Sequence, residues 1–593
     1  MATSNSKTGP TAPPDAGIAA GTEPYEKHTT SICPECMTRI PATIVEVRED
    51  LIVMRKQCPQ HGEFEDVIAN GVDGVALYKA SQRHLRNGTP NANPEKKVER
   101  GCPFDCGICG NHKSAPACAM VDVTNRCNLN CPVCFANANQ HGQVVEWTYE
   151  EILRIYRHFR SIKPKPPAIA MMAGGEPTVR DDLPDIIREL ALMGFRQIQI
   201  ATNGIRFAKD IEYYRRCLQA AFQPGTDCGI VIYLQFDGTT PETYVRTRGL
   251  NVFPYKDRLV QNAKQLAREG VVSSGICLVA TITKDNVFEV PNIIRYAAEN
   301  IEVVSGVMFQ PVAFCGRISD EQLKEMRITT YDVIQKIDEE TGGVLRPWRP
   351  FPAYHSLMNF VAWYNGDTVE GWVGGGDSTA YTNQVEFTCN PQCGFVTFLH
   401  VDRAKDGTIK YDGVQRLVHL ADAIDFTERM WEEAKQTKRG TFFEEALGKI
   451  TGSLGDLGRI LDDFAFWGRK LAKKYKFILG ALRYIKLENL LDPTILHTLN
   501  VLFRPSWWTT RNFLVEARNL YVGVMHFQDA YDLDVERCER CLVQYGVISP
   551  EDGNVYCYPF CAFNTCHRDR VEKEIAAERA VPLQAGDVEL VRE

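Results

Sequence analysis

Between residues 119 and 312 the chain alternates short runs of nonpolar residues with longer segments of helical periodicity. Near-continuous nonpolar strands separated by amphipathic helices predict a parallel sheet covered by helices. Six such repeats predict an α/β fold, a partial (β/α)6 barrel of the TIM type, whose ligands bind at the carboxyl ends of the strands. The predicted strands are AMVDVTNR, AIAMMAG, RQIQIATN, IVIYLQFD, GICLVATIT and VVSGVMFQP, and the predicted helices span 148–161, 182–193, 207–221, 257–269 and 287–299.

The flanking segments have other patterns. The first residues are rich in Ser, Thr, Pro, Ala and Gly, which predicts a disordered tail. The β-type runs ATIVEVRE and LIVMRKQ, framed by cysteine pairs, predict a hairpin of the zinc-ribbon or rubredoxin type. We therefore divide the chain into a tail (1–30), a metal domain with its linker (31–100), an auxiliary cluster segment (101–118), the partial barrel (119–315) and a mainly helical C-terminal domain with a second auxiliary cluster (316–593).

Composition and charge exclude several classes of protein. A hydrophobic content of 44% is typical of a globular protein, and the net charge of -8 gives no reason to expect nucleic-acid binding. No nonpolar run approaches the length of a spanning helix and no secretory segment opens the chain, so we expect a cytoplasmic protein. The 21 cysteines stand mostly in short-spaced groups. In a reducing compartment such groups are typical of metal ligands rather than disulfides.

The first group with clear chemistry is Cys127-x3-Cys131-x2-Cys134, directly after the first barrel strand. Three thiolates bind three irons of a [4Fe–4S] cubane and leave the fourth iron open. An open iron is what S-adenosylmethionine needs, because its amino and carboxylate groups chelate the metal. We therefore predict that these cysteines are catalytic and hold the cluster that cleaves S-adenosylmethionine to a 5′-deoxyadenosyl radical.

A second motif supports this prediction. Gly174-Gly175-Glu176-Pro177 ends the second strand, ATNG ends the third and LQFDG ends the fourth. In order and spacing these motifs resemble the radical S-adenosylmethionine (radical SAM) superfamily over about 200 residues. The resemblance implies that the GGEP turn binds the methionine ammonium group and that Phe135 lines the adenine pocket. Asn203, Gln235 and Asp237 are candidates to contact the cofactor or substrate, or else to cap helices and satisfy loop backbone.

Two further cysteine groups predict auxiliary clusters. Cys102, Cys106, Cys109 and Cys118 would close a [4Fe–4S] cluster without an open iron, although a zinc knuckle is an alternative. Near the C-terminus seven thiols exceed the need of one cluster, and we select Cys389, Cys393, Cys541 and Cys561 as ligands of the second. The roles of Cys538, Cys557 and Cys566 stay open.

The N-terminal hairpin carries its own ligand set, Cys33-x2-Cys36-x21-Cys58-x2-His61. Three sulfurs and an imidazole suit mononuclear Zn²⁺, or Fe in a rubredoxin-like site. We expect a structural role for this metal. Whether His61 or a distant cysteine is the fourth ligand stays open.

The whole chain resembles one branch of the superfamily more closely, on the CPxC…CPxHG hairpin, the CNLNCPVCFA loop and MHFQDAYDLDVERCERC…PFCAFN. This branch contains the archaeal tetraether lipid synthases and relatives once described as pterin methylases. The resemblance implies lipid biosynthesis: hydrogen abstraction from unactivated alkyl carbons and carbon–carbon bonds between hydrocarbon chains, with ferredoxin or flavodoxin as electron donor. The alternatives are a methylase of a pterin or other small heterocycle, and a peptide-modifying enzyme.

A lipid substrate also requires contact with headgroups. The segment FAFWGRKLAKKYKFILGALRYIKL at 464–487 is basic within an acidic chain. A basic amphipathic helix can lie on anionic headgroups, so we expect contacts from Lys470, Lys473, Lys474 and Lys476 and a peripheral membrane association. The alternative is a helix that packs its nonpolar face on the core and leaves a solvated basic face.

Overall fold

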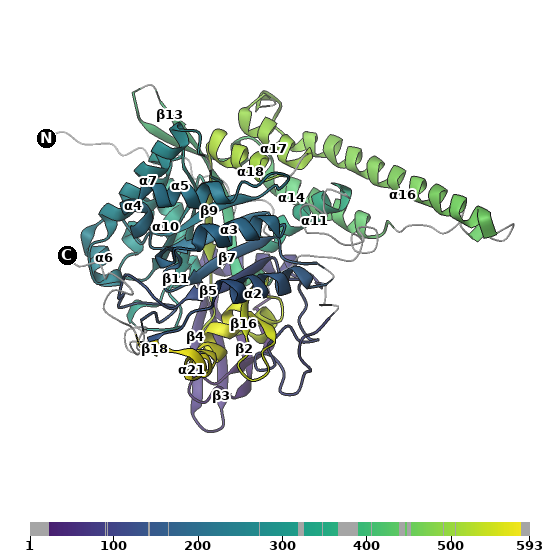
Figure 1. The fold of residues 1–593 in the computed structure, drawn as a ribbon. Helices are drawn as coiled ribbons and strands as arrows, with labels where there is room; N and C mark the ends of the chain where they lie inside the picture. Colours follow the sequence, from purple (N-terminus) through teal and green to yellow (C-terminus); the bar gives the residue numbers. More distant parts are fainter. Residues whose placement is uncertain are drawn as a thin grey trace.

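The computed structural model describes residues 23–88, 91, 93–139, 143–163, 165–271, 273–317, 325–346, 348–365, 389–404, 406–437, 445–446, 452–489, 491–503 and 506–582. Two large sheets and one two-stranded sheet organise these residues (Figure 1). The larger sheet carries the predicted barrel, and the smaller one is the N-terminal antiparallel sheet. No helix of the described residues is long and nonpolar enough to cross a membrane.

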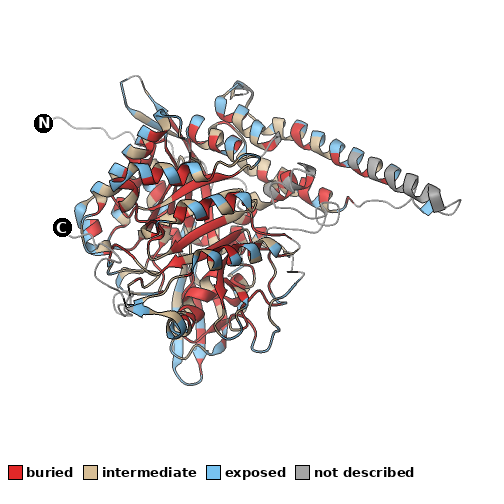
Figure 2. Ribbon diagram, viewed as in Figure 1, coloured by how far each residue is buried: buried red, intermediate tan, exposed pale blue. Residues whose placement is uncertain are grey.

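The barrel prediction is confirmed. All six predicted strands pair in parallel and in sequence order, and helices cover one face of the sheet (Figures 1 and 2). The strands are β5 (Cys118–Thr124), β7 (Ile169–Gly174), β8 (Gln197–Thr202), β9 (Gly229–Gln235), β10 (Ile276–Ile282) and β11 (Val304–Pro311). The helices are α2 (Tyr149–Ser161), α3 (Leu183–Leu192), α4 (Ile205–Lys209), α5 (Ile211–Ala220), α6 (Pro241–Arg248), α7 (Phe253–Arg268), α8 (Val290–Glu299) and α10 (Thr330–Thr341).

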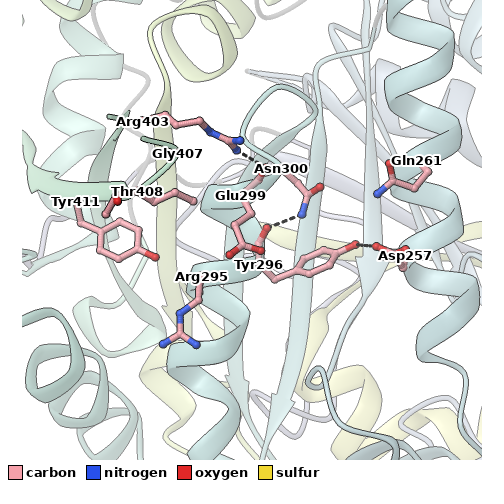
Figure 3. A pocket seen from close by; sticks show the side chains of 11 residues that line it. Asp257, Gln261, Arg295, Tyr296, Glu299, Asn300, Arg403, Gly407, Thr408 and Tyr411 are labelled. Carbon is pink, nitrogen blue, oxygen red and sulfur yellow. Dashed lines mark hydrogen bonds between the residues drawn. The ribbon is translucent and has the colours of Figure 1, made fainter. Parts of the chain in front are cut away.

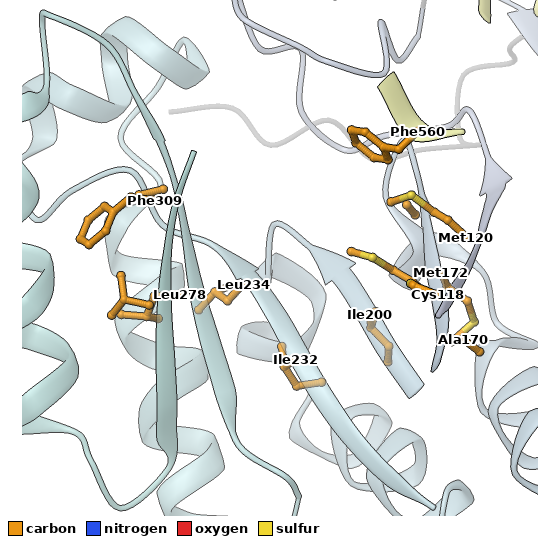
Figure 4. Close-up of a cluster of buried hydrophobic side chains, with 14 of the residues drawn as sticks. Cys118, Met120, Ala170, Met172, Ile200, Ile232, Leu234, Leu278, Phe309 and Phe560 are labelled. Carbon is orange, nitrogen blue, oxygen red and sulfur yellow. The ribbon is translucent and has the colours of Figure 1, made fainter. Parts of the chain in front are cut away.

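Alternation along each strand divides the sheet into two faces. Ile232, Leu234 and Leu278 belong to the main core beneath the helices (Figure 4). Val231, Tyr233 and their neighbours point to the other face, because successive side chains of a strand alternate. The helices begin where the sequence supplies caps: Thr148 forms a capping box with Glu151 at the start of α2.

The C-terminal segment adds strands that the sequence analysis did not predict. It contributes β12 (Arg349–Pro350), β13 (Gly394–Arg403), β14 (Ile409–Gly413), β15 (Asn519–Met525), β16 (Val543–Ile548) and β17 (Val555–Pro559). Two of these strands extend the barrel sheet at its opposite edges. β15 pairs with β11 and β16 pairs with β5, both in parallel. The last cysteines therefore lie beside the first barrel strand.

The predicted helices of the C-terminal segment form a separate core. α11 (Phe351–Asn365), α14 (Leu420–Lys435), α16 (Gly452–Ala481) and α17 (Pro493–Phe503) enclose Phe360, Trp431, Phe477 and their neighbours. α16 extends away from the barrel (Figure 1). The remaining helices are α18 (Trp507–Arg511), α19 (Val535–Cys538), α20 (Phe560–Ala562) and α21 (Arg568–Arg579), and β18 (Val581–Pro582) pairs with β6 (Gln143–Val144).

The N-terminal sheet consists of β1 (Glu26–Ile32), β2 (Arg39–Arg48), β3 (Leu51–Cys58) and β4 (Gly62–Asn70), followed by α1 (Val72–Ser81). β1 begins inside the segment predicted as tail, so the tail prediction is wrong for residues 26–30, while residues 1–22 lie outside the described ones. β1 is an edge strand with mostly polar residues, which gives little hydrophobic signal.

Buried ions attach this sheet to the DAYDLDVER segment. Arg327 pairs with Asp529 at 2.8 Å, with Asp532 at 3.2 Å and with Asp66 of β4. Thr29 of β1 donates to Asp534 at 2.6 Å. The N-terminal sheet and the DAYDLDVER segment, which lie near opposite ends of the sequence, therefore contact each other directly.

Candidate active site and metal centres

The three predicted catalytic cysteines lie together on the loop after β5. Cys127, Cys131 and Cys134 form a small buried cluster with Leu129 and Tyr244. Burial raises the pKa of the Cys127 thiol, and Glu176, Cys131 and Cys134 nearby raise it further. Three converging thiols at the carboxyl edge of a parallel sheet fit the binding of three irons of a cubane.

Two polar side chains hold this loop in shape. Arg317 donates to the carbonyl oxygen of Cys131 at 2.9 Å and to Asn130 Oδ1 at 2.7 Å. Asn139 accepts from the Cys127 amide at 3.0 Å and donates to its carbonyl at 2.8 Å. Sequence reasoning missed both residues, because their partners are mostly backbone groups that carry no sequence signal.

The GGEP turn packs directly on the strand that leads to Cys127. Gly175 donates its amide to Thr124 O at 2.7 Å, and Glu176 donates to Arg126 O at 2.8 Å. A Cβ atom on Gly174 would stand 2.2 Å from Thr124 O, and one on Gly175 would stand 2.2 Å from Arg126 O. Only glycine fits this close approach of two backbones.

Glu176 ties the ends of β7 and β8 together. Its buried carboxylate accepts from the hydroxyls of Thr178 and Thr202, both at 2.6 Å, and from the amide of Asn203 at 2.7 Å. Asn203 in turn reaches Asn128 Oδ1 at 2.6 Å and the Cys127 sulfur at 4.0 Å. The predicted residues Glu176 and Asn203 therefore lie at the cluster loop. Pro177 is buried at the start of the short helix that follows Glu176.

Asp237 forms an ion pair within the protein. Arg248 donates to its two oxygens at 2.7 and 2.9 Å, and the Thr281 amide donates at 3.1 Å. Burial by itself would raise the pKa of the Asp237 carboxyl, but the Arg248 guanidinium outweighs burial and holds it below its usual value. Arg248 also lies near Cys131. Asp237 therefore holds an arginine beside one of the three predicted cluster cysteines.

Lys256 is a buried cation that sequence reasoning missed, because a lysine within an amphipathic helix is ordinarily exposed. It donates to Asn203 O at 2.5 Å and to Gln235 Oε1 at 2.8 Å. Burial, with Arg248 nearby, lowers its pKa to about 7. The Gln235 Nε2 atom is buried and has no hydrogen-bond partner in the described structure. Gln235 can thus donate to a bound molecule at the end of β9.

Phe135 directly follows the third cysteine, Cys134, and contacts aromatic residues of the C-terminal motif. Its ring stacks on Phe560, with centroids 5.5 Å apart, and lies 5.9 Å from Phe527. Both partners belong to the C-terminal motif. Phe135, which we predicted to line the adenine pocket, therefore packs the loop of Cys127, Cys131 and Cys134 against the segment that carries the C-terminal cysteines.

The structure regroups the auxiliary cysteines. Cys102 lies next to Cys538. Burial raises the pKa of the Cys106 thiol, and Cys538, Cys566 and Cys109 nearby raise it further. Cys118 instead lies near Cys541. The pairing of β16 with β5 causes this arrangement, because Val543 stands opposite Cys118 in the register.

The four cysteines selected for the second cluster lie near one another, and Cys538 is also a neighbour of Cys561. Cys389 is hydrogen bonded to Cys393, with Cys541 nearby, and Cys541 in turn has Cys561 and Cys393 as neighbours. Four buried or partly buried thiols fit a closed [4Fe–4S] cluster. Cys557 lies apart from both sets, with Glu95 and His158, whose side chains hydrogen bond at 2.8 Å.

We predict that Cys538→Ser removes auxiliary cluster iron to the same extent as Cys102→Ser. The thiol of Cys538 lies next to that of Cys102, whereas Cys118 lies near Cys541 of the second set. Iron and sulfide analysis of the anaerobically reconstituted proteins measures the effect, with Cys217→Ser as a matched control for loss of a buried thiol. Full iron in Cys538→Ser together with iron loss in Cys118→Ser would restore the ligand set expected from sequence.

The N-terminal ligand set fits a single tetrahedral metal. The His61 Nδ1 atom lies 3.6 Å from the Cys33 sulfur and 3.5 Å from the Cys58 sulfur, and the Cys36 and Cys58 sulfurs are 3.9 Å apart. Ordinary zinc–ligand bond lengths in a tetrahedron require about 3.5 Å between nitrogen and sulfur and about 3.8 Å between sulfurs. His61 thus supplies the fourth donor that the sequence left open.

The predicted headgroup lysines lie on α16 in different environments. Lys470 is only 3% exposed, with its ammonium near the rings of Trp363 and Phe466, so it does not face the solvent. Lys473 and Lys476 donate to Glu433 of α14. Lys474 is partly buried. The lysines themselves therefore do not form one solvent-facing row.

A polar cavity of about 710 Å³ lies elsewhere, between α7, α8 and the β13–β14 hairpin (Figure 3). Asp257, Tyr296 and Arg403 are among the residues that line it, and Tyr296 donates to Asp257 at 2.9 Å. None of its lining residues is a predicted cofactor ligand. It is not the site of the cluster chemistry.

Two family models and one relative match this chain. The HMPTM N-terminal zinc ribbon domain matches residues 25–70, and the radical SAM superfamily matches residues 121–297. The chain is 36% identical over 562 residues, 94% of its length and 96% of the relative's, to 7,8-dihydro-6-hydroxymethylpterin dimethyltransferase of Methanocaldococcus jannaschii.

Other similarities are partial. A probable GTP 3′,8-cyclase of Methanothermobacter marburgensis is 30% identical over 135 residues, which is 23% of this chain and 39% of that protein. The crystal structure of Streptococcus suis SuiB bound to precursor peptide SuiA superposes with a TM-score of 0.30 and 17% identity, over 40% of this chain and 47% of that one. The near-complete match to the first relative, together with the cysteine loop and the GGEP turn, shows that this chain belongs to the radical SAM superfamily and, within it, to the family of that dimethyltransferase.

Proposed function

We propose that this radical SAM enzyme acts on the hydrocarbon chains of membrane lipids and joins two unactivated alkyl carbons. The observation that carries the proposal is a second nonpolar cluster on the sheet, separate from the main core. Its members point away from the covering helices. They are Val231 and Tyr233 of β9, Cys277 and Val279 of β10, Met308 of β11, Tyr521 and Met525 of β15, and Phe351.

This nonpolar cluster begins close to the loop that carries Cys127, Cys131 and Cys134. Tyr233 stands two residues before Gln235, which is about 7 Å along a strand, and Gln235 hydrogen bonds to Lys256 beside the cysteines. Nonpolar side chains at this position suit contact with an alkyl chain. A pterin, whose ring edge carries several donors and acceptors, would leave them unpaired against the same side chains.

We assign the cluster to Cys127, Cys131 and Cys134. Bound there, a [4Fe–4S] cluster with S-adenosylmethionine would supply a 5′-deoxyadenosyl radical, which can remove hydrogen from an unactivated carbon. Glu176 and Asn203 fix the ends of β7 and β8 around the cofactor, and the free Gln235 amide can orient it. Asp237 holds Arg248 near Cys131.

The overall reaction balances as follows. Two C–H bonds of the lipid and the C5′–S bonds of two S-adenosylmethionine molecules break, and one C–C bond forms. The two hydrogens leave in two molecules of 5′-deoxyadenosine, and two molecules of methionine are released. Each cleavage consumes one electron, which a reduced ferredoxin or flavodoxin would supply. The two auxiliary sets, which we assign as closed [4Fe–4S] clusters, provide no open iron for a second cofactor.

Methylation of a pterin is the second candidate. The name of the M. jannaschii relative favours it. So does the unpaired amide of Gln235, which could bind a ring nitrogen or carbonyl oxygen. A pterin would have to bind at the carboxyl ends of the strands, beyond the nonpolar cluster.

The deciding experiment supplies lipid with perdeuterated chains to the anaerobic, iron-reconstituted protein together with S-adenosylmethionine and reductant. We expect deuterium in 5′-deoxyadenosine and a lipid product lighter by two deuterium atoms per bond formed. A parallel incubation contains 6-hydroxymethyl-7,8-dihydropterin instead. Methylated pterin there, with unlabelled 5′-deoxyadenosine in the lipid sample, would reject lipid coupling in favour of the second candidate.

A further inference from the structure

The solvent-facing side of α16 is nonpolar, which is the reverse of an ordinary surface helix. Leu471, Tyr475 and Leu479 are 53%, 56% and 63% exposed. They are spaced four residues apart and therefore lie on one face of the helix. Gly468 and Ala472 are exposed on the same face, and no polar side chain other than Tyr475 lies on it between residues 468 and 479, all of which are described.

The opposite face of α16 explains how the helix is attached. Phe477 packs against Phe360 and Phe426, with centroid distances of 4.6 and 5.8 Å. A Cβ atom on Gly480 would stand 2.3 Å from the Phe426 ring, so the two helices are in close contact there. The nonpolar stripe is thus not left exposed by a poorly packed helix, because α16 buries its other face against α11 and α14.

Basic side chains border the stripe. With 3.6 residues per turn, Arg469 and Lys476 lie along one side of it and Lys474 along the other. From Phe464 to Leu487 the chain has seven basic residues and no acidic one, although the net charge of the whole is -8. Exposed nonpolar residues with a tyrosine at the centre and a basic border are typical of helices that lie in a membrane interface.

We propose that the stripe of Leu471, Tyr475 and Leu479 docks on the surface of an anionic lipid bilayer. The three side chains enter the boundary between headgroups and acyl chains, while the bordering Arg469 and Lys474 lie at the level of the phosphates. Lys476 instead pairs with Glu433. The proposal moves the membrane contact from the lysines expected in the sequence to the nonpolar residues between them. It rests on the proposed lipid substrate only in naming why the enzyme would dock.

The test is cosedimentation of the full reconstituted enzyme with vesicles of phosphatidylglycerol and phosphatidylcholine. The variant Leu471→Ser/Leu479→Ser is expected to lower the partition coefficient at least tenfold, because each leucine contributes that much when it is buried. Leu192→Ser, on an equally exposed leucine of α3, is the matched control and should bind as the original protein does. Pure phosphatidylcholine vesicles should bind more weakly, by roughly fivefold per bordering basic residue.

Three results would overturn the docking proposal. The original protein could remain in the supernatant with anionic vesicles, or the double variant could sediment as the original does. The stripe could instead hold a second copy, in which case the original protein would elute as a dimer, the double variant as a monomer, and neither would bind vesicles.

The coupling assay with detergent-dispersed lipid separates this proposal from the proposed function, because the double variant should keep its activity there. Loss of vesicle binding with full detergent activity supports both, and absence of any lipid product in detergent rejects the proposed function alone.

Discussion

Replacing Gly175 with alanine is expected to lower the formation of 5′-deoxyadenosine by at least about 10²-fold, although no cysteine changes. The added Cβ atom would stand 2.2 Å from the carbonyl oxygen of Arg126, a backbone atom that cannot move away alone. The GGEP turn and the strand before Cys127 must separate, and a displacement of about 1 Å at a reacting centre can cost that much.

The measurement is anaerobic cleavage of S-adenosylmethionine, followed by chromatography of 5′-deoxyadenosine. Gly468→Ala is the control, since a Cβ atom there meets nothing within 4 Å and alanine favours a helix. Iron content must be measured in parallel. If Gly175→Ala kept both its iron and its cleavage rate, the close packing of the turn on the cysteine loop would have no role in the chemistry.

Arg327→Ala is expected to release the N-terminal sheet from the rest of the molecule. Arg327 is the shared partner of Asp529, Asp532 and Asp66, and the first two carboxylates are almost fully buried. Removing one partner of a buried ion pair leaves an uncompensated charge and costs about 3–5 kcal/mol. Burial raises the pKa of Asp66 to about 7 even beside Arg327, so this carboxyl is already poorly solvated.

Hydrogen exchange measures this local effect better than global unfolding, because the molecule has several metal-containing units. Amides of β1–β4 should exchange about 10²–10³-fold faster in Arg327→Ala, while those of the barrel strands keep their protection. Arg48→Ala, which breaks an exposed pair with Asp50, should change exchange little. Adding Asp529→Asn to Arg327→Ala should restore part of the protection. Equal exchange in Arg327→Ala and the original protein would mean that the sheet is held by other contacts.

Local patterns were sufficient for the barrel. Each strand of the barrel is a nonpolar run, and each predicted helix has a period of 3.6 residues, so neither needs distant residues to be recognised. α6 was missed because its exposed charged residues leave little nonpolar periodicity. β15 and β16 were missed for another reason: short strands next to a long helical segment resemble buried helical turns until a pairing partner is known.

The sequence by itself was sufficient to locate the loops that carry the predicted metal ligands and the GGEP turn. Spacing places Cys127, Cys131 and Cys134 on one loop, two glycines on the turn beside it, and Cys33, Cys36, Cys58 and His61 at one end of a hairpin. Ligands that are close in sequence need only a local turn to converge.

Only the tertiary structure decided which distant residues meet. The pairing of β16 with β5 brings Cys538 to Cys102 and Cys541 to Cys118, across more than 400 residues of chain. Arg248 and Lys256 reach the cysteine loop because α6 and α7 follow β9 in space as well as in sequence. The solvent-facing stripe of α16 depends on which face α11 and α14 cover. Strand order and helix packing are set by the summed burial of the whole core, which no local pattern encodes.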